Sequence, residues 1–264
     1  LALDKPMTKR ILMYHGLPTP EFQVFESPDD PIDDDLLDER GYLRFPLFVK
    51  PSREGTSMGV SAQSIVRSVD ELRAQVARQI RLYNQPILCE HYIEGREVMV
   101  GMVGNLKPTT ARKLNERALS QDVPEGLTML PPLEVDLNAF RESEADLYTN
   151  RLKTELSDEC TYLVPAPLEP ELARQLNVLA AAVFRVIGCK DVARVDFRLD
   201  KHNHNKPYIL EINPLPGLTP NFSDLCYEAE AYGWTYEQLI NAIVDTAAVR
   251  LGLVESQPRP AGAD

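Results

Sequence analysis

Apolar residues recur along the chain with two different periods, one typical of helices and one typical of strands. Spacings of three and four residues predict helices over residues 4–15, 68–83, 170–187 and 236–251. Short apolar runs bounded by turn residues predict strands over residues 45–49, 87–89, 97–103, 192–199 and 208–212. Helices and strands alternate, which is typical of a mixed α and β fold.

Some of these helices carry clear end signals. Ser68, with Glu71 three residues later, forms the pattern of a capping box. Gly188 directly follows the third helix, where it can end the helix in a left-handed conformation. Residues 107–165 are polar and poorly periodic, with short alternating pieces after Pro132, so the sequence does not resolve their elements. The last residues, from about 255, form a tail rich in Pro and Gly that need not fold.

The last two predicted strands form a hairpin, because the segment between them is short and rich in turn residues. Successive side chains of a strand point to opposite faces, so Arg194 shares a face with Asp196. By the same alternation, Glu211 and Asn213 share the matching face of the neighbouring strand. The positions between them are apolar and are expected to face a core: Val195, Phe197, Leu210 and Ile212.

Polar groups clustered on this hairpin suggest a metal site. Carboxylates are costly to bury unless a cation or hydrogen bonds compensate them. Oxygen ligands such as Asp196, Glu211 and Asn213 suit Mg²⁺, which takes one or two carboxylates together with substrate phosphates. A surface salt bridge between Arg194 and a neighbouring acid is the simpler alternative. That alternative explains neither Asn213 nor the Pro and Gly turn at residues 214–217.

Two further segments suggest a nucleotide. The glycine-rich loop at residues 53–59 lacks the GK[ST] of a P-loop, but its backbone N–H groups and hydroxyls could cover phosphates. Lys50 precedes the loop and favours an anion site. Residues 90–97 place Glu90 before a stretch of exposed backbone and Glu97 after it, where they could bind an adenine and a ribose. By composition alone, however, the first segment is a glycine-rich turn and the second a hairpin.

The composition is that of an ordinary soluble protein, with 264 residues of which 44% are hydrophobic and 26% charged. The longest apolar stretch, residues 178–184, is far shorter than the roughly 20 residues of a bilayer span. No leader is evident, so we expect neither export nor a membrane partner. The 28 Lys and Arg against 40 Asp and Glu give a net charge of −12, which makes nucleic acid an unfavourable partner.

Cysteine and histidine residues indicate no further chemistry. The four cysteines are far apart without a CxxC pair, which predicts reduced thiols and a cytoplasmic location. His202 and His204 could bind a metal, but a solvated hairpin tip is the interpretation that we favour. His15 and His91 have no Cys or Ser nucleophile in a recognisable motif, so a His-assisted hydrolase is not supported. The acidic run within residues 29–39 is interpreted as a solvated loop.

In their order and spacing, six segments resemble the D-alanine:D-alanine ligase family of the ATP-grasp superfamily. They are DK at 4–5 with TK at 8–9, FPLFVKPSREGTSMG at 45–59, EHYIEGRE at 90–97, Lys153, RVD at 194–196 and EINPLPGLT at 211–219. Each is modest alone, but together they are specific and extend over residues 1 to about 251. The stretch from Leu218 to Leu225 is longer than in the commonest members, which leaves the second substrate open.

The resemblance implies an α/β (α+β) ATP-grasp fold, with two subdomains that grip ATP between them. It divides the chain into an N-terminal helix and acidic connector (1–41), a nucleotide-binding subdomain with the lid loop (42–104), a C-terminal subdomain with the magnesium site (105–254) and a flexible tail (255–264). Complete members also carry an N-terminal lobe. Because Leu1 already matches the helix that follows that lobe, we expect the lobe to be missing from this chain.

The resemblance also implies a role for each site residue. The ATP phosphates are held by Lys5, Lys50 and Lys153. The adenine is held by Glu90, His91 and the Ile93 backbone, the ribose by Glu97, and the lid is formed by Thr56 and Ser57. Two Mg²⁺ ions, with Mn²⁺ as an alternative, are bound by Asp196, Glu211 and Asn213. The residues expected to act on the reacting groups are Arg194, the Gly217 backbone N–H, Ser57 and Lys153.

The function implied is that of an ATP-dependent carboxylate–amine ligase, which forms D-alanyl-D-alanine through an acyl phosphate for peptidoglycan synthesis. The expected partners are small amino acids, D-alanine first, and a second copy of the full-length protein. One alternative keeps the chemistry but joins other amino acids or a peptide. Another is an ATP-binding fragment that is inactive without its N-terminal lobe.

Overall fold

The computed structural model describes residues 1–38, 40–41, 43–107, 114, 122–140, 143 and 147–254. Its helices are α1 (Lys5–Tyr14), α2 (Val69–Tyr83), α5 (Asn150–Thr154), α6 (Pro170–Ile187), α7 (Asp224–Ala231) and α8 (Tyr236–Arg250). Its strands are β1 (Phe22–Phe25), β2 (Leu47–Pro51), β3 (Ile65–Val66), β4 (Ile87–His91), β5 (Gly95–Gly104), β6 (Leu127–Met129), β7 (Leu133–Asp136), β8 (Thr161–Leu163), β9 (Val192–Asp200) and β10 (Lys206–Asn213). Each predicted helix and strand corresponds to one of these elements.

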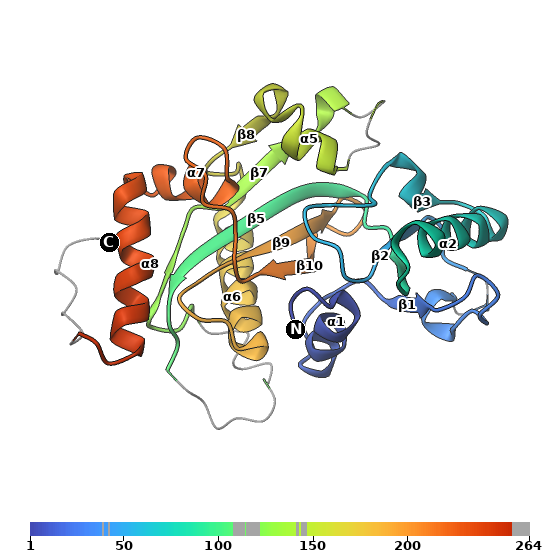
Figure 1. The fold of residues 1–264 in the computed structure, drawn as a ribbon, viewed down its shortest axis with the longest axis horizontal. Helices are drawn as coiled ribbons and strands as arrows, with labels where there is room; N and C mark the ends of the chain where they lie inside the picture. The colour runs from blue at the N-terminus through green and yellow to red at the C-terminus, as the bar shows by residue number, and fades with distance from the viewer. Residues whose placement is uncertain are drawn as a thin grey trace.

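The smaller sheet is antiparallel, with the order β1-β4-β2-β3, and α2 packs on it at one end of the molecule (Figure 1). Leu72 and Val76 of α2 are fully buried against the sheet. Ser68 caps α2 by accepting a hydrogen bond from the Glu71 N–H at 3.2 Å. The predicted capping box is wrong in its second half, because the Glu71 carboxylate accepts from the Arg67 N–H instead.

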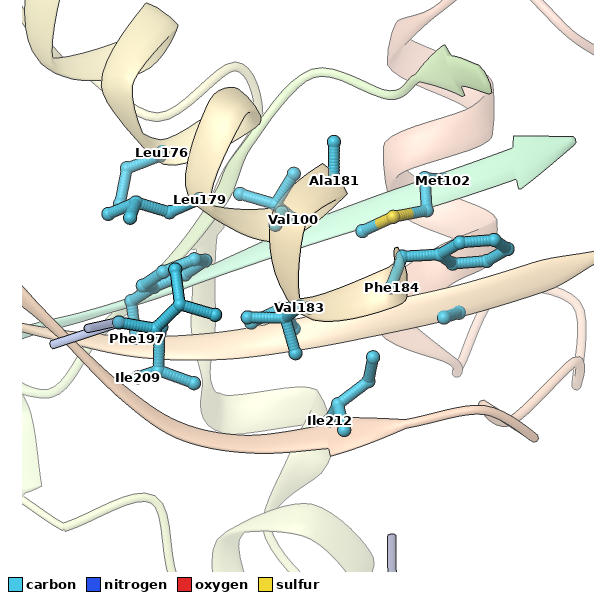
Figure 2. Close-up of a cluster of buried hydrophobic side chains, with 14 of the residues drawn as sticks. Val100, Met102, Leu176, Leu179, Ala181, Val183, Phe184, Phe197, Ile209 and Ile212 are labelled. Atoms are coloured by element: carbon cyan, nitrogen blue, oxygen red, sulfur yellow. The ribbon is translucent and has the colours of Figure 1, made fainter. Parts of the chain in front are cut away.

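The larger sheet has the order β10-β9-β5-β7-β8, with β6 paired to β5. Helix α6 covers one face, and Figure 2 shows its Phe184 beside Met102 of β5. On the opposite face, Val103 packs in a separate cluster with Leu225 of α7 and residues of α8. Since β5 alternates its side chains between two covered faces, it is buried along most of its length.

The β9–β10 hairpin is confirmed, with Glu211 opposite Asp196 and Asn213 opposite Arg194. A β-bulge shifts the register between Ile209 and Glu211. It turns Ile209 into the core, whereas Leu210 is half-buried and lines the cleft described below. The prediction that Leu210 faces the core is therefore wrong, because a bulge adds one residue and breaks strict alternation.

Residues 90–97 do not form the simple hairpin that their composition allows. Strand β4 pairs with β1 and β2 of the smaller sheet, whereas β5 pairs with β9 of the larger one. The chain thus crosses from one sheet to the other between His91 and Gly95. Although it falls within the range 42–104 expected for the nucleotide-binding subdomain, β5 belongs to the larger sheet.

The segment whose elements the sequence did not resolve contains β6, β7, α5 and β8 in its described residues. Each has three to five residues, too few for a period to show. The predicted tail, 255–264, lies outside the described residues. Among the described residues, no helix combines the length and apolar character needed to cross a membrane.

Candidate active site

A cleft of about 760 Å³, partly open to solvent, lies where the two sheets meet the glycine-rich loop and α1. Many of its lining residues are charged, although the cleft also has apolar walls that include Phe48, Val60 and Leu147. Ten of the predicted site residues line it: Lys5, Lys50, Ser57, Glu90, His91, Ile93, Glu97, Lys153, Asp196 and Glu211. Residues far apart in sequence are therefore brought to one cleft.

Lys9, Lys50 and Glu90 form what we call the lysine cluster. Lys50 Nζ lies 2.5 Å from one Glu90 carboxylate oxygen, and Lys9 Nζ lies 2.6 Å from the other. Burial by itself would raise the pKa of Glu90, but the two lysines lower it below its ordinary value. Glu90 is thus held as a carboxylate, with a cation against each oxygen.

Lys9 is connected to the cleft through Glu90, and the sequence predicted no role for it. Its side chain is 1% exposed, and its Nζ donates to Thr19 Oγ1 at 2.7 Å. Thr19 Oγ1 in turn donates to the Ile209 carbonyl of β10. Burial, only partly offset by Glu90, lowers the pKa of Lys9 to about 8. Its position four residues after Lys5 on α1 was the signal, since both then lie on one helix face.

Lys5 joins α1 to the glycine-rich loop and to β10. Asp4 is the N-cap of α1, and its carboxylate accepts a hydrogen bond from the Met7 N–H. Lys5 Nζ donates to the Glu54 carbonyl and lies 3.6 Å from Glu211 Oε2. Because Lys5 is buried, its pKa is lowered. Helix α1 thus places the Lys5 ammonium group in the lining of the cleft.

Glu97, Asp196 and Glu211 form the carboxylate cluster, with Arg194 and Asn213 beside it. The Arg194 guanidinium binds Asp196 through two hydrogen bonds, of 2.7 Å and 2.9 Å. The Asn213 amide nitrogen lies 3.2 Å from Asp196 Oδ2 and 3.4 Å from Glu211 Oε1. The predicted gathering of four polar groups on one face of the hairpin is confirmed.

The pKa values in the carboxylate cluster are shifted in opposite directions. Burial raises the pKa of Asp196, and Arg194 only partly offsets this effect. Burial likewise raises the pKa of Glu97, although Arg198 lies 3.7 Å from its carboxylate. Burial would also raise the pKa of Glu211, but the surrounding lysines, Lys5 first, lower it to about 2. At Asp196 and Glu97 the effect of burial on the pKa is therefore larger than the opposing effect of the nearby cations.

This donor set fits Mg²⁺. Asp196 and Glu211 offer hard oxygen atoms from opposite positions of one hairpin, and the Asn213 side chain reaches both. In the part of the chain that the structure describes, no group of three or more His, Cys, Asp or Glu side chains could hold a metal by itself. A cation here would therefore also need the Asn213 oxygen and phosphate oxygens from a substrate.

The glycine-rich loop reaches across to the segment that leads into α5. Thr56 and Ser57 both adopt left-handed backbone conformations, with φ of 51° and 53°. Ser57 Oγ donates to the Tyr148 carbonyl at 3.0 Å, and the Asn150 side chain donates to the Thr56 carbonyl at 2.8 Å. Ser57 therefore faces the cleft, whereas Thr56 is exposed and contacts the opposite segment through its backbone.

Lys153 and Tyr148 complete this wall of the cleft. Lys153 Nζ lies 4.5 Å from the centre of the Tyr148 ring, within the range of a cation–π contact. Tyr148 was missed at the sequence level because it lies in the segment without a periodic pattern. It is 5% exposed, so a buried aromatic residue holds the lysine that α5 carries.

His91 and Ile93 line the cleft near the crossing between the two sheets. The His91 ring nitrogen Nε2 lies 3.3 Å from the Asp35 carbonyl oxygen and 3.7 Å from Glu21 Oε2. Burial lowers the pKa of His91, and the nearby Arg44 adds to that effect. These contacts tie His91 to the acidic connector.

The described residues that line the cleft do not include Thr56, Arg194, Asn213 or Gly217. Arg194 and Asn213 reach the cleft through their bonds to Asp196. Gly217 lies on the exposed turn after β10, where a Cβ atom would come within 2.7 Å of Ser223 Oγ. Its position therefore has little room for a side chain.

Comparison with protein families identifies the relatives of this chain. The family model described as "D-ala D-ala ligase C-terminus" matches residues 11–125 and 129–245. The chain belongs to this family. The α/β ATP-grasp fold that the resemblance implied is confirmed by solved structures that share it.

Individual relatives agree with the family model. The D-alanine--D-alanine ligase of Bordetella avium is 31% identical over 251 residues, which cover 95% of this chain and 68% of that protein. "Uncharacterized protein y4sG" of Sinorhizobium fredii is 33% identical over 247 residues, which cover 94% of this chain and 63% of that protein. The chain thus spans about two thirds of the length of the curated relatives it matches.

Solved structures extend the comparison to three dimensions. A crystal structure of D-alanine--D-alanine ligase from Bacillus anthracis complexed with ATP superimposes with a TM-score of 0.65 at 25% identity. The match covers 96% of this chain and 68% of that one. The chain therefore shares its fold with a relative whose structure was solved with ATP.

Proposed function

We propose that this protein is part of an ATP-dependent ligase that joins the carboxylate of one amino acid to the amine of another. The observation that carries the proposal is the cleft whose lining brings Lys5, Lys50 and Lys153 together with the carboxylate cluster. Phosphoryl transfer depends mainly on positioning and on neutralising phosphate charge, and cations beside a metal site supply both. The names of the ligase relatives and the ATP bound to one of them support the same activity.

In this proposal ATP lies along the cleft with its base between apolar side chains such as Phe48 and Leu210. His91 and the Ile93 backbone lie beside the base, and Glu97 accepts hydrogen bonds from the ribose hydroxyls. Glu90 acts mainly by fixing Lys50, because both of its oxygens already contact lysines. Lys5, Lys50 and Lys153 bind the phosphates, while Thr56 and Ser57 cover them.

Asp196, Glu211 and Asn213 would hold magnesium, with manganese as the alternative ion. When bound, the metal would neutralise charge on the phosphates that are being transferred. Both Asp196 oxygens accept hydrogen bonds from Arg194, so the guanidinium lies next to the proposed metal site. A net charge of −12 does not oppose ATP binding, because salt screens charges that are more than about 8 Å away. The electrostatic potential at the cleft is therefore set mainly by the lysines that line it.

The reaction has two steps. A carboxylate oxygen of the first amino acid attacks the γ-phosphorus of ATP; an O–P bond forms, the bond to the β–γ bridging oxygen breaks, and ADP leaves. The amine of the second amino acid then attacks the carbonyl carbon of the acyl phosphate; a C–N bond forms, phosphate leaves and the amine loses a proton. Arg194 and the Gly217 N–H stabilise the oxyanion of this second step, each worth about 3 to 4 kcal/mol in the barrier.

We propose D-alanine for both substrates, on the names of the relatives, and hence a role in peptidoglycan precursor synthesis in the cytoplasm. The four free cysteine thiols agree with a reducing compartment. A homodimer of the full-length protein remains a prediction. A second candidate keeps the chemistry but takes another amino acid or a peptide, as the longer segment after Gly217 allows.

A substrate screen tests the proposal. The full reading frame that contains this chain is supplied with ATP, Mg²⁺ and single amino acids, and phosphate release is measured. Release that depends on D-alanine supports the proposal, with L-alanine and no amino acid as controls. Release that depends on another amino acid supports the second candidate. ATP binding without turnover on any amino acid contradicts both.

A further inference from the structure

Arg194 is held by two carboxylates, and the proposed mechanism uses only one of them. Asp196 accepts hydrogen bonds from the Nε and Nη2 groups of Arg194, at 2.7 Å and 2.9 Å. Asp224, on α7, accepts a hydrogen bond from the Nη1 group at 2.6 Å. Both acids and the guanidinium are buried. A guanidinium has five N–H donors, so these three bonds leave two for a ligand, counted over the residues that the structure describes.

The position of Asp224 is set by tight packing of α7 on the larger sheet. Leu225 is fully buried, and Glu228 Oε1 accepts a hydrogen bond from the Gly101 N–H at 2.7 Å. Gly101 lies opposite Arg194 in the β5–β9 pairing. A Cβ atom at Gly101 would come within 2.5 Å of both Glu228 and Leu225, so glycine allows this close approach. The first residue of α7 is thereby placed beside the guanidinium.

Tyr148 connects Asp224 to the glycine-rich loop. Its hydroxyl donates to Asp224 Oδ1 at 3.4 Å, and it lies 3.0 Å from the Tyr162 hydroxyl. If Tyr148 donates to Asp224, Tyr162 must donate to Tyr148, which gives one consistent direction of donors. The Tyr148 carbonyl accepts from Ser57 Oγ. One residue therefore contacts the loop through its backbone and Asp224 through its side chain.

We propose that Asp224 is a positioning residue that orients Arg194 toward the reacting carbonyl, and that Tyr148 links this orientation to the glycine-rich loop. The inference rests on the proposed function. Asp196 cannot fulfil this role alone, because a metal would compete with the guanidinium for its oxygens. Asp224 holds the opposite side of Arg194, away from the proposed metal ligands, and so keeps the guanidinium in place when the metal binds.

The first test replaces Asp224 in the full-length protein. With Asp224→Asn we expect kcat for amide formation to fall about 10- to 100-fold, while KM for ATP changes less than about 3-fold. ATP binding and the melting temperature are measured in parallel to show that the variant is folded. Unchanged kcat, or a loss that appears only in KM for ATP, would overturn the proposal.

The second test uses the hydroxyl of Tyr148, whose backbone contact with Ser57 survives substitution. Tyr148→Phe should lower kcat by less than Asp224→Asn, and the double variant should be no slower than Asp224→Asn alone. Tyr232→Phe is the matched control, because it removes the hydroxyl of an exposed tyrosine at the end of α7 and should leave kcat unchanged. Additive losses in the double variant would overturn the link.

These outcomes are distinct from failure of the proposed function. If the unmodified protein shows no amino-acid-dependent release of ADP, the proposed function fails and the variants are not informative about it. If the unmodified protein is active and Asp224→Asn matches it, the role of Asp224 alone is refuted.

Discussion

The lysine cluster and the carboxylate cluster differ in how their buried carboxylates are compensated. In the lysine cluster, Lys9 and Lys50 surround one carboxylate, and the pKa of Glu90 is lowered. In the carboxylate cluster the effect of burial exceeds that of the nearby cations at Asp196 and Glu97, and the pKa values of these two acids are raised. The buried carboxylate of the lysine cluster is therefore compensated by the protein itself, whereas Asp196 and Glu97 are compensated only in part.

This contrast predicts that the lysine cluster contributes more to the stability of the fold than the carboxylate cluster does. Glu90→Gln leaves two lysines buried without their carboxylate, and breaking a buried ion pair costs about 3 to 5 kcal/mol. We expect urea denaturation to show a loss of that size in the free energy of unfolding. A loss below about 1 kcal/mol would mean that water or a rearranged side chain replaces the carboxylate.

The carboxylate cluster should matter more for activity. Asp196→Asn removes a proposed metal ligand and a partner of Arg194, so we expect the rate of phosphate release to fall about 100-fold or more, with little loss of fold. The rise in melting temperature caused by Mg²⁺ with ADP, compared with ADP and EDTA, should disappear as well. Asp245→Asn, on the exposed side of α8, is the matched control. An unchanged rate would refute the metal assignment.

The pH dependence of stability tests a third buried acid, Glu228, which is close enough to Arg194 and Asp196 to interact with them. Its burial raises its pKa well above the ordinary value of 4.5, although the Gly101 N–H partly offsets this. The folded protein thus holds a proton that the unfolded chain releases, and stability falls as pH rises above about 4.5, by up to about 1.4 kcal/mol per pH unit. Glu228→Gln should flatten this slope between pH 5 and about 7 in denaturation measurements. An identical slope in both proteins would show that Glu228 does not carry the proton.

The smallest effect is expected for an ion pair outside the cleft. Arg174 and Glu171 lie on the exposed side of α6, three residues apart, with 2.7 Å between their charged atoms. Water screens an exposed pair, so Arg174→Gln should leave the free energy of unfolding nearly unchanged. The same denaturation measurement therefore serves as the surface reference for Glu90→Gln. A loss as large as that of Glu90→Gln would remove the distinction between buried and exposed pairs.

Much of the carboxylate cluster could be predicted from the sequence. Arg194, Asp196, Glu211 and Asn213 lie on two strands joined by a short turn, so local alternation and pairing are enough to bring them together. The bulge at Leu210 could not be predicted, because nothing in the local pattern indicates the extra residue. The contact of Asp224 with Arg194 was also missed, since it joins residues 30 positions apart on different elements.

By itself, the sequence determined the main helices and strands, the polar face of the β9–β10 hairpin and the resemblance to the ligase family. Those features depend on neighbouring residues, whose spacing is dictated by the geometry of helix and strand. Only the tertiary structure decided that Lys9 and Lys50 share Glu90, that Tyr148 meets both Ser57 and Asp224, and that β4 and β5 separate into two sheets. These contacts depend on how sheets and helices pack, which the order of residues along one element does not specify.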